Sequence, residues 1–315
     1  MRNWRGLGRR SAALAKSVAR SAADPLARAL VTLILQAVRR ADRLWVSEVF
    51  ARITRTIGPW LPEHRLGRAN LAAAFPEKSL DEIERILAGV WDNLGRYVAE
   101  FAHLDQLTEG DPHNLPYLKF DVVSKARFDR VRDDGRPALV FAAHLANWEL
   151  PAIMAAAWGL DAMVLYRRPN VGAVAEAVIA IRKGGMGTLV PTSAAAPIRL
   201  ARALEDNRHV AIFIDQHYVK GVEVTFFGRR CRANPLIAAL ARHVEAPIHG
   251  TRIIREPGGR FRVEITEAIP PVRDAEGKVD IQGTMQAITS VVEGWVREHP
   301  EQWLWLHRRW RDEAQ

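Results

Sequence analysis

The spacing of apolar residues divides the chain into two regions. Between residues 43 and 101 apolar side chains recur every three or four positions, as in helices with one apolar face. This spacing predicts helices at 43–57 and 66–75, closed by Gly58-Pro59 and by Pro76. Ser79 then precedes early acidic residues and caps a third, long helix that reaches residue 101.

From residue 117 short apolar runs alternate with helical patterns. The predicted strands lie at 117–123, 138–143, 162–166, 187–190 and 210–214. The predicted helices between and after them lie at 124–132, 150–158, 172–183 and 195–206. A hairpin-like stretch (222–227), a helix (235–244), two strands (248–254 and 260–265) and a helix (281–299) follow. This alternation predicts an α/β fold with a mostly parallel central sheet flanked by helices.

One strand-to-helix junction carries ionisable side chains. The apolar run 138–143 stops at His144, and Glu149 follows five positions later where a helix begins. Open α/β sheets place their sites at such junctions. On one regular helix the two residues would point about 140° apart, so a pairing requires His144 in the turn and Glu149 in the first helical turn. Asn147 is placed to cap that helix. The same spacing also occurs where a structural histidine stands near a solvated glutamate.

The charge is concentrated at one end of the chain. The 315 residues carry a net charge of +9, and residues 1–43 hold nine arginines and one lysine against two aspartates, which gives +8. A basic amphipathic end on a near-neutral body favours an anionic membrane surface over nucleic acid. We therefore predict that 1–43 is a basic segment that associates with a membrane. Its uninterrupted apolar stretch, 29–38, is shorter than the roughly 20 residues of a spanning helix, so crossing and lying on the bilayer both stay open.

Several chemistries lack their sequence signatures. The single cysteine, Cys231, excludes an internal disulfide and a cysteine-based zinc site. The chain has no Gly-x-Ser-x-Gly elbow, no His-Glu-x-x-His pair and no phosphate loop. We therefore expect no metal, no cofactor and no nucleic-acid partner. A histidine base oriented by a carboxylate remains, and it suits proton removal from a substrate hydroxyl during direct acyl transfer.

Five motifs in order carry a resemblance to a known family. They are His144-x-x-Asn147-Trp148-Glu149, Tyr166-Arg167-Arg168-Pro169, Asp215-Gln216, 224–228 and 301–310. From about residue 40 onward the chain resembles the bacterial lipid A late acyltransferases, the lauroyl/myristoyl acyltransferase family within the lysophospholipid acyltransferase superfamily. The resemblance implies a glycerol-phosphate-acyltransferase-like fold over 44–315.

The same resemblance implies an activity and a location. The expected enzyme works at the cytoplasmic face of the bacterial inner membrane, in lipopolysaccharide biosynthesis. It moves a fatty acyl chain from acyl carrier protein to a hydroxyl on a hydroxyacyl chain of a lipid A precursor.

The implied roles fall on particular residues. His144 would be the general base and Glu149 its catalytic partner. Arg167 or Arg168 would contact the acceptor or the developing charge, and the second arginine leaves open which of them does so. Asp215, Gln216 and Asn147 would belong to the substrate pocket.

Three alternatives stay open. An acyltransferase with the same chemistry could act on a lysophospholipid or a glycosylated phospholipid. A catalytically silent protein could use the basic end to bind a membrane or a partner. The tail that contains Trp303, Trp305 and Trp310 suits either an interfacial aromatic belt or a clamp that holds the C-terminus to the body.

Overall fold

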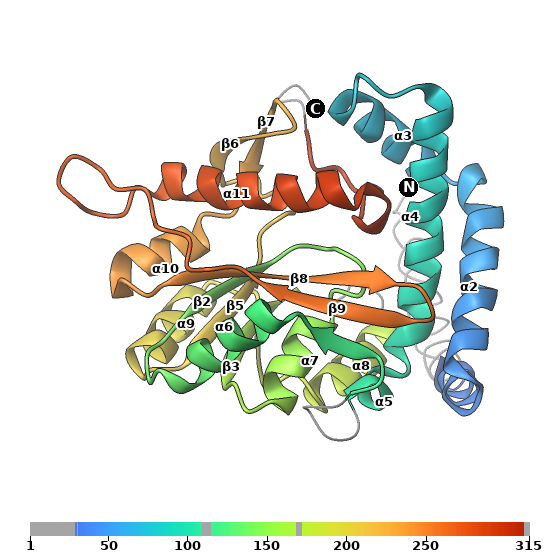
Figure 1. Cartoon of the computed structure of the whole chain (residues 1–315), viewed down its shortest axis with the longest axis horizontal. Helices are drawn as coiled ribbons and strands as arrows, with labels where there is room; N and C mark the ends of the chain where they lie inside the picture. The colour runs from blue at the N-terminus through green and yellow to red at the C-terminus, as the bar shows by residue number, and fades with distance from the viewer. Residues whose placement is uncertain (1–28, 30, 109–114, 168–171, 312–315) are drawn as a thin grey trace, which may run out of the picture.

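A single mixed sheet forms the centre of the molecule (Figure 1). The computed structural model describes residues 29, 31–108, 115–167 and 172–311. Within them seven strands take the order β1-β9-β8-β2-β5-β3-β4, and only the β8–β9 pair is antiparallel. Their bounds are β1 Leu118–Phe120, β2 Leu139–Ala142, β3 Ala162–Tyr166, β4 Thr188–Pro191, β5 His209–Phe213, β8 Ile248–Glu256 and β9 Arg260–Ile265. The predicted α/β class with a mostly parallel sheet is confirmed.

Helices cover both faces of the sheet. One apolar core holds α9 (Ala196–Glu205), α10 (Leu236–Val244) and α11 (Ile281–Glu298). The other holds α6 (Val122–Asp133), α7 (Leu150–Ala157) and α8 (Gly172–Lys183). A separate antiparallel hairpin, β6 (Val222–Phe226) and β7 (Arg229–Ala233), packs against α11.

Helices from the first third of the chain stand at one end of the sheet (Figure 1). They are α2 (Arg43–Ile57), η1 (Gly58–Trp60), α3 (Pro62–Ala74), α4 (Leu80–Phe101) and α5 (Leu104–Thr108). The capping box at Ser79 and Glu82 starts α4 as its sequence predicts. α2 packs along α4, so α4 lies between α2 and the body.

Several element boundaries differ from the sequence prediction, and at one of them a capping hydrogen bond outweighs residue preference. Val122 and Val123, predicted to end a strand, begin α6 instead. The carboxylate of Asp121 accepts hydrogen bonds from the backbone N–H groups of Val123 and Ser124 and caps this helix. The five-residue helix α5 lies between residues 101 and 117, where the sequence analysis placed no helix or strand.

The C-terminal tail is a clamp and not an interfacial belt. Trp303, Trp305 and Trp310 are all buried in the main core. Phe226 at the end of β6 stacks on Trp310, and the guanidinium of Arg229 lies 4.7 Å from the centre of the Trp310 ring. The tail therefore belongs to the body of the fold.

No helix within the described residues is long and apolar enough to cross a bilayer. Of the basic segment 1–43, the structure describes residue 29 and residues 31–43, which include a helical stretch at 31–40. The rest of that predicted segment lies outside the described residues.

The close approach of α2 and α4 depends on a glycine. A Cβ added at Gly95 would lie 2.3 Å from Oγ1 of Thr54 and 2.5 Å from the carbonyl oxygen of Phe50. We expect Gly95→Ala to lower the free energy of unfolding by about 1–3 kcal/mol, because the two helices must separate. Gly294→Ala is the matched control, since a Cβ on this α11 glycine meets nothing within 4 Å. Thermal denaturation should show the loss at position 95 only, and equal melting temperatures would contradict it.

Candidate active site

Strand register brings two motifs of the sequence together. In the parallel β2–β5 pair Ala142 lies opposite Phe213, and His144 and Asp215 each follow two residues later. The carboxyl ends of neighbouring parallel strands lie at one edge of the sheet, so the two side chains meet there. Nδ1 of His144 lies 2.7 Å from Oδ1 of Asp215.

Asp215 is a buried carboxylate with three N–H donors. Besides the His144 ring, the His144 backbone N–H donates to Oδ2 at 2.7 Å and the Trp303 indole N–H at 2.8 Å. The Asp215 side chain is only 1% exposed. Burial acts to raise the pKa of Asp215, but the charge of His144 and its hydrogen bonds lower it well below the usual range. The group therefore stays ionised.

The ionised Asp215 fixes the tautomer of His144. A carboxylate only accepts hydrogen bonds, so Nδ1 of the ring carries the proton and Nε2 presents its lone pair. The amide nitrogen of Gln216 lies 3.3 Å from Nε2 and donates to it. Gln216 is exposed, so a substrate hydroxyl can take the place of its amide at the same lone pair. His144 is thus arranged as a base whose Nε2 accepts a hydrogen bond from the pocket side.

The segment after His144 is held by the C-terminal tail. Leu145 forms an antiparallel bridge with Trp303, and the Leu304 N–H donates to the carbonyl of His144 at 3.2 Å. Ala146 has a left-handed backbone with φ of 48°, which is uncommon for a residue with a side chain. Its N–H donates to the carbonyl of Gln302 at 2.9 Å. The tail thus forces the turn that aims His144.

The structure corrects the predicted pairing of His144 with Glu149. Glu149 is 4% exposed and accepts a hydrogen bond from the Tyr97 hydroxyl at 2.8 Å. Arg182, near the end of α8, forms a bidentate ion pair with the same carboxylate, with Nε at 2.9 Å from Oε2. Burial and the negative charge of Glu149 raise the pKa of Tyr97 well above its ordinary value, so its hydroxyl stays a donor.

Asn147 faces away from the pocket. It is fully buried, and its side-chain amide donates to Glu100 at 3.0 Å. Arg255 forms an ion pair with the same Glu100 carboxylate and donates from Nε to Asn93 at 2.9 Å. Asn147 therefore ties the turn to α4 and β8, and it is not among the residues that line the pocket at His144.

His144 and Glu149 line one pocket of about 760 Å³. Arg167, Arg182 and Gln216 also line it. Asp215 is absent from this wall because it lies behind His144. Arg168 lies outside the described residues, so the choice between Arg167 and Arg168 is not decided by position.

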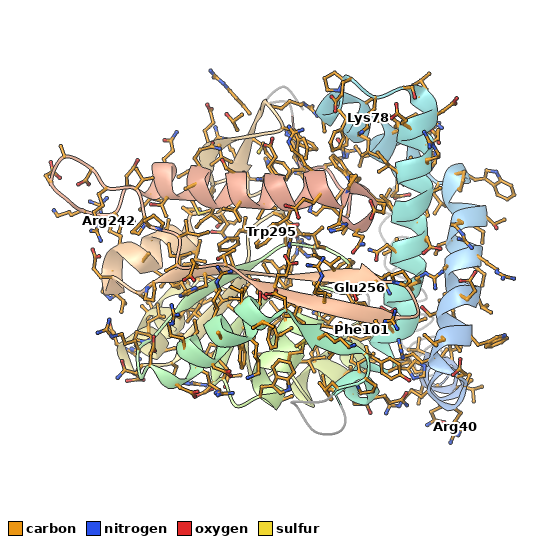
Figure 2. All side chains as sticks on the ribbon, in the orientation of Figure 1. Arg40, Lys78, Phe101, Arg242, Glu256 and Trp295 are labelled. Atoms are coloured by element: carbon orange, nitrogen blue, oxygen red, sulfur yellow. The ribbon has the colours of Figure 1, made fainter. Side chains whose placement is uncertain are left out.

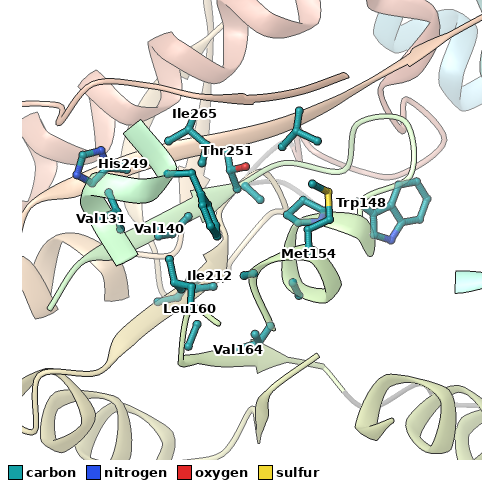
Figure 3. Close-up of a pocket in the computed structure, with 18 of the residues that line it drawn as sticks. Val131, Val140, Trp148, Met154, Leu160, Val164, Ile212, His249, Thr251 and Ile265 are labelled. Carbon is teal, nitrogen blue, oxygen red and sulfur yellow. The ribbon is translucent and has the colours of Figure 1, made fainter. Parts of the chain in front are cut away.

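A smaller apolar cavity of about 70 Å³ adjoins this pocket. The two share Trp148, Ala152, Val164, Ile212 and Phe213 as wall residues. Figure 3 shows Val140, Met154 and Ile212 around the cavity, with His249 and Thr251 as polar exceptions. The site therefore combines a polar chamber with an apolar recess between the sheet and helices α6 and α7.

Three residues of the site escaped the sequence analysis. Tyr97 belongs to the apolar face of the long helix, Arg182 is an ordinary basic residue near a helix end, and Trp303 was assigned only to the tail. The tail motif itself was a signal for Trp303. No local pattern marks Arg182 or Tyr97, because their partner Glu149 is distant in sequence.

The Glu149–Arg182 pair gives a stability test of the corrected geometry. Arg182→Met should cost roughly 3 kcal/mol, because it leaves a buried carboxylate without its cation. Adding Glu149→Leu to this variant should recover part of the loss. Arg52→Met, which breaks an exposed ion pair with Glu48, is the control and should cost about 1 kcal/mol or less. Urea denaturation of the unmodified protein, Arg52→Met, Arg182→Met, Glu149→Leu and the double variant measures this, and strict additivity of the two core changes would contradict the pairing.

The sequence model of the family described as bacterial lipid A biosynthesis acyltransferase matches residues 20–312. A comparison with curated proteins gave no match. The matched range contains the His144 turn, Asp215 and the C-terminal clamp. The chain therefore belongs to the bacterial lipid A biosynthesis acyltransferase family.

Proposed function

We propose that the enzyme transfers a fatty acyl chain from acyl carrier protein to a hydroxyl on a hydroxyacyl chain of a lipid A precursor. The observation that carries this proposal is the His144–Asp215 dyad at a pocket that opens beside an apolar recess. Membership of the acyltransferase family supports the reaction class and the lipid A acceptor. The acyl-carrier donor and the particular hydroxyl are the proposed refinements.

The dyad would perform the proton transfers. Nε2 of His144 takes the proton of the acceptor hydroxyl as its oxygen attacks the thioester carbon, and Asp215 stabilises the imidazolium. When the tetrahedral intermediate collapses, the C–S bond breaks and the imidazolium returns the proton to the departing thiolate. The products are an ester and a free carrier thiol. In this mechanism Asp215 takes the orienting role that the sequence analysis gave to Glu149.

Glu149 would act as a positioning residue for Arg182. Its carboxylate holds the guanidinium at the pocket wall, and Arg167 reaches the same chamber. Two cations in one pocket suit the phosphates of a lipid A precursor or the negative charge that develops on the thioester oxygen. Gln216 would meet the hydroxyl that displaces its amide from Nε2.

The apolar recess would hold the methyl end of the acyl chain. It begins at residues shared with the His144 pocket and is otherwise lined almost wholly by hydrocarbon side chains. Apolar lining with few polar groups is what a fatty acyl chain requires.

The location proposed for this reaction is the cytoplasmic face of the inner membrane. The acceptor is a lipid, and residues 1–43 carry eight net positive charges that suit an anionic bilayer. The proposed division is a membrane-associating segment at 1–43 and an acyltransferase domain at 44–315.

Substitution of the dyad tests the mechanism. His144→Ala should lower the rate of acyl transfer by about 10²–10⁴, because proton removal is lost. Asp215→Asn should cause a loss of similar order through the wrong tautomer, whereas Glu149→Gln should be milder. His243→Ala, at an exposed histidine, is the control. The assay supplies acyl carrier protein loaded with lauroyl or myristoyl chains and a tetra-acylated, sugar-extended lipid A precursor, and mass spectrometry records the product.

Two results would contradict the proposal. Full activity of His144→Ala would remove the general base. Full activity of Asp215→Asn beside an inactive Glu149→Gln would restore the pairing that the sequence suggested. Competing acceptors in the same assay, a lysophospholipid and a glycosylated phospholipid, test the lipid A assignment, which fails if either is acylated faster.

Filling the apolar recess should shorten the preferred acyl chain. Ala155 on α7 lines the recess but not the His144 pocket. Ala155→Leu should therefore reduce kcat/KM for the longest accepted chain relative to a shorter one by about tenfold. Ala157→Leu, an exposed change on the same helix, is the control. A series of acyl carrier proteins from decanoyl to palmitoyl gives the profile, and an unchanged profile would place the tail elsewhere.

A further inference from the structure

The outer side of α2 and η1 carries a line of exposed apolar side chains. Trp45, Val49, Ile53 and Ile57 are spaced four residues apart, which sets them along one ridge of a helix. Val49 is half-buried, and the other three are exposed. Trp60 in η1 continues the line. Trp60 is 81% exposed and Trp45 is 63% exposed. We call these five residues the α2 stripe.

The α2 stripe is not needed for the packing of its own helix. α2 buries Ser47 and Ala51 on its opposite side, toward α4, and it buries Val46 between that side and the stripe. Figure 2 shows side chains projecting from the side of α2 that faces away from α4. Exposed apolar side chains gathered along one side of a helix and bordered by charged residues are typical of a surface that contacts another molecule.

Other exposed apolar residues extend the same end of the molecule. Leu33 and Ile34 lie on the helical stretch that precedes α2. Val98 lies on α4 beside the region where Arg96 forms an ion pair with Glu48 of α2. Exposed apolar side chains therefore lie on three helical segments at this end of the molecule, residues 31–40, α2 and α4.

The charges beside the stripe favour an anionic lipid surface as the occupant. Within the described chain, the guanidinium of Arg40 contacts the carbonyl of Gln36 and no carboxylate. Figure 2 shows Arg40 at the end of the molecule where α2 begins. Residues 1–43, which lead directly into the stripe, carry eight net positive charges. Cations that flank an apolar line containing tryptophan are typical of helices that lie in a bilayer interface.

The shape of the stripe fits a bilayer better than a protein partner. The line is narrow and has the charged side chains of Glu48, Arg52 and Arg55 beside it. The centre of a protein–protein interface is depleted of charged residues. In a bilayer interface, by contrast, charged groups at the edge of an apolar line remain among headgroups and water.

We propose that the α2 stripe is the surface by which the folded body lies on an anionic bilayer. The proposal rests on the membrane location proposed above and extends the contact surface beyond residue 43. It places α2 and α4 between the bilayer and the site, since α2 packs on α4 and Tyr97 of α4 bonds Glu149 in the pocket wall. A lipid acceptor then has to move past these two helices to reach His144.

Vesicle flotation with the full chain tests the stripe. The vesicles contain phosphatidylglycerol and phosphatidylethanolamine, and the variant is Trp45→Ser/Ile53→Ser/Trp60→Ser. Partition into the vesicle fraction should fall by on the order of tenfold or more. The matched control is Val122→Ser/Ile198→Ser on α6 and α9, which removes apolar side chains that are 87% and 60% exposed outside the stripe. The control should float as the unmodified protein does, and all proteins keep the basic segment.

Three outcomes would overturn the proposal. Undiminished flotation of the stripe variant would show that the basic segment alone binds. Equal partition of the unmodified chain into phosphatidylcholine vesicles would contradict the anionic preference. Loss of a dimer in light scattering, with flotation unchanged, would assign the stripe to self-association.

Acyl transfer to a detergent-solubilised acceptor separates this inference from the proposed function. The stripe variant should keep its activity there, because the stripe contributes no residue to the site. If flotation depends on the stripe but the unmodified chain transfers no acyl group, the α2 stripe is supported as the membrane-contact surface and only the proposed acyl transfer is refuted. Normal transfer beside a stripe that does not affect flotation would refute only the surface.

Discussion

The buried carboxylate of Asp215 is the group on which the site depends. A charge with 1% exposure is costly unless donors surround it. Here the donors are the ring and backbone N–H groups of His144 and the indole of Trp303. These hydrogen bonds to the carboxylate therefore align the ends of β2 and β5, set the tautomer of His144 and hold the C-terminal tail against the sheet. Stability and chemistry are served by the same hydrogen bonds.

A second charge pair, Glu149 with Arg182, lies in the wall of the same pocket. Glu149 is held by Arg182 and Tyr97, so α4, α7 and α8 are joined at one point. The two residues of the His-x4-Glu motif thus face different partners. Both residues line the same pocket, and the apolar recess adjoins it. The motif marks a place in the fold and not a contact between its two members.

The sequence predicted the parts of the fold that depend on local pattern. The alternation of apolar runs with helical patterns predicted the mostly parallel sheet, and Ser79 predicted the start of α4. Register between strands distant in sequence is not encoded in any one segment, so the meeting of His144 with Asp215 was missed although both were candidates. The sequence analysis paired Glu149 with His144 for the same reason, because no local sequence pattern marks Arg182 as the partner of Glu149. The apolar spacing of α2 was correct as a helix pattern, but it does not tell which apolar residues face α4 and which face outward.

The position of Trp303 in the chain has a consequence for biosynthesis. Trp303 comes 88 residues after Asp215, and His144 is made earlier still. While a nascent chain lacks the tail, the carboxylate has one donor fewer and the turn at Ala146 has no Gln302 carbonyl to hold it. The dyad is thus completed late in synthesis, after the sheet strands and α11 have been made. A product truncated before Trp303 would contain both residues of the dyad without the clamp that aims them.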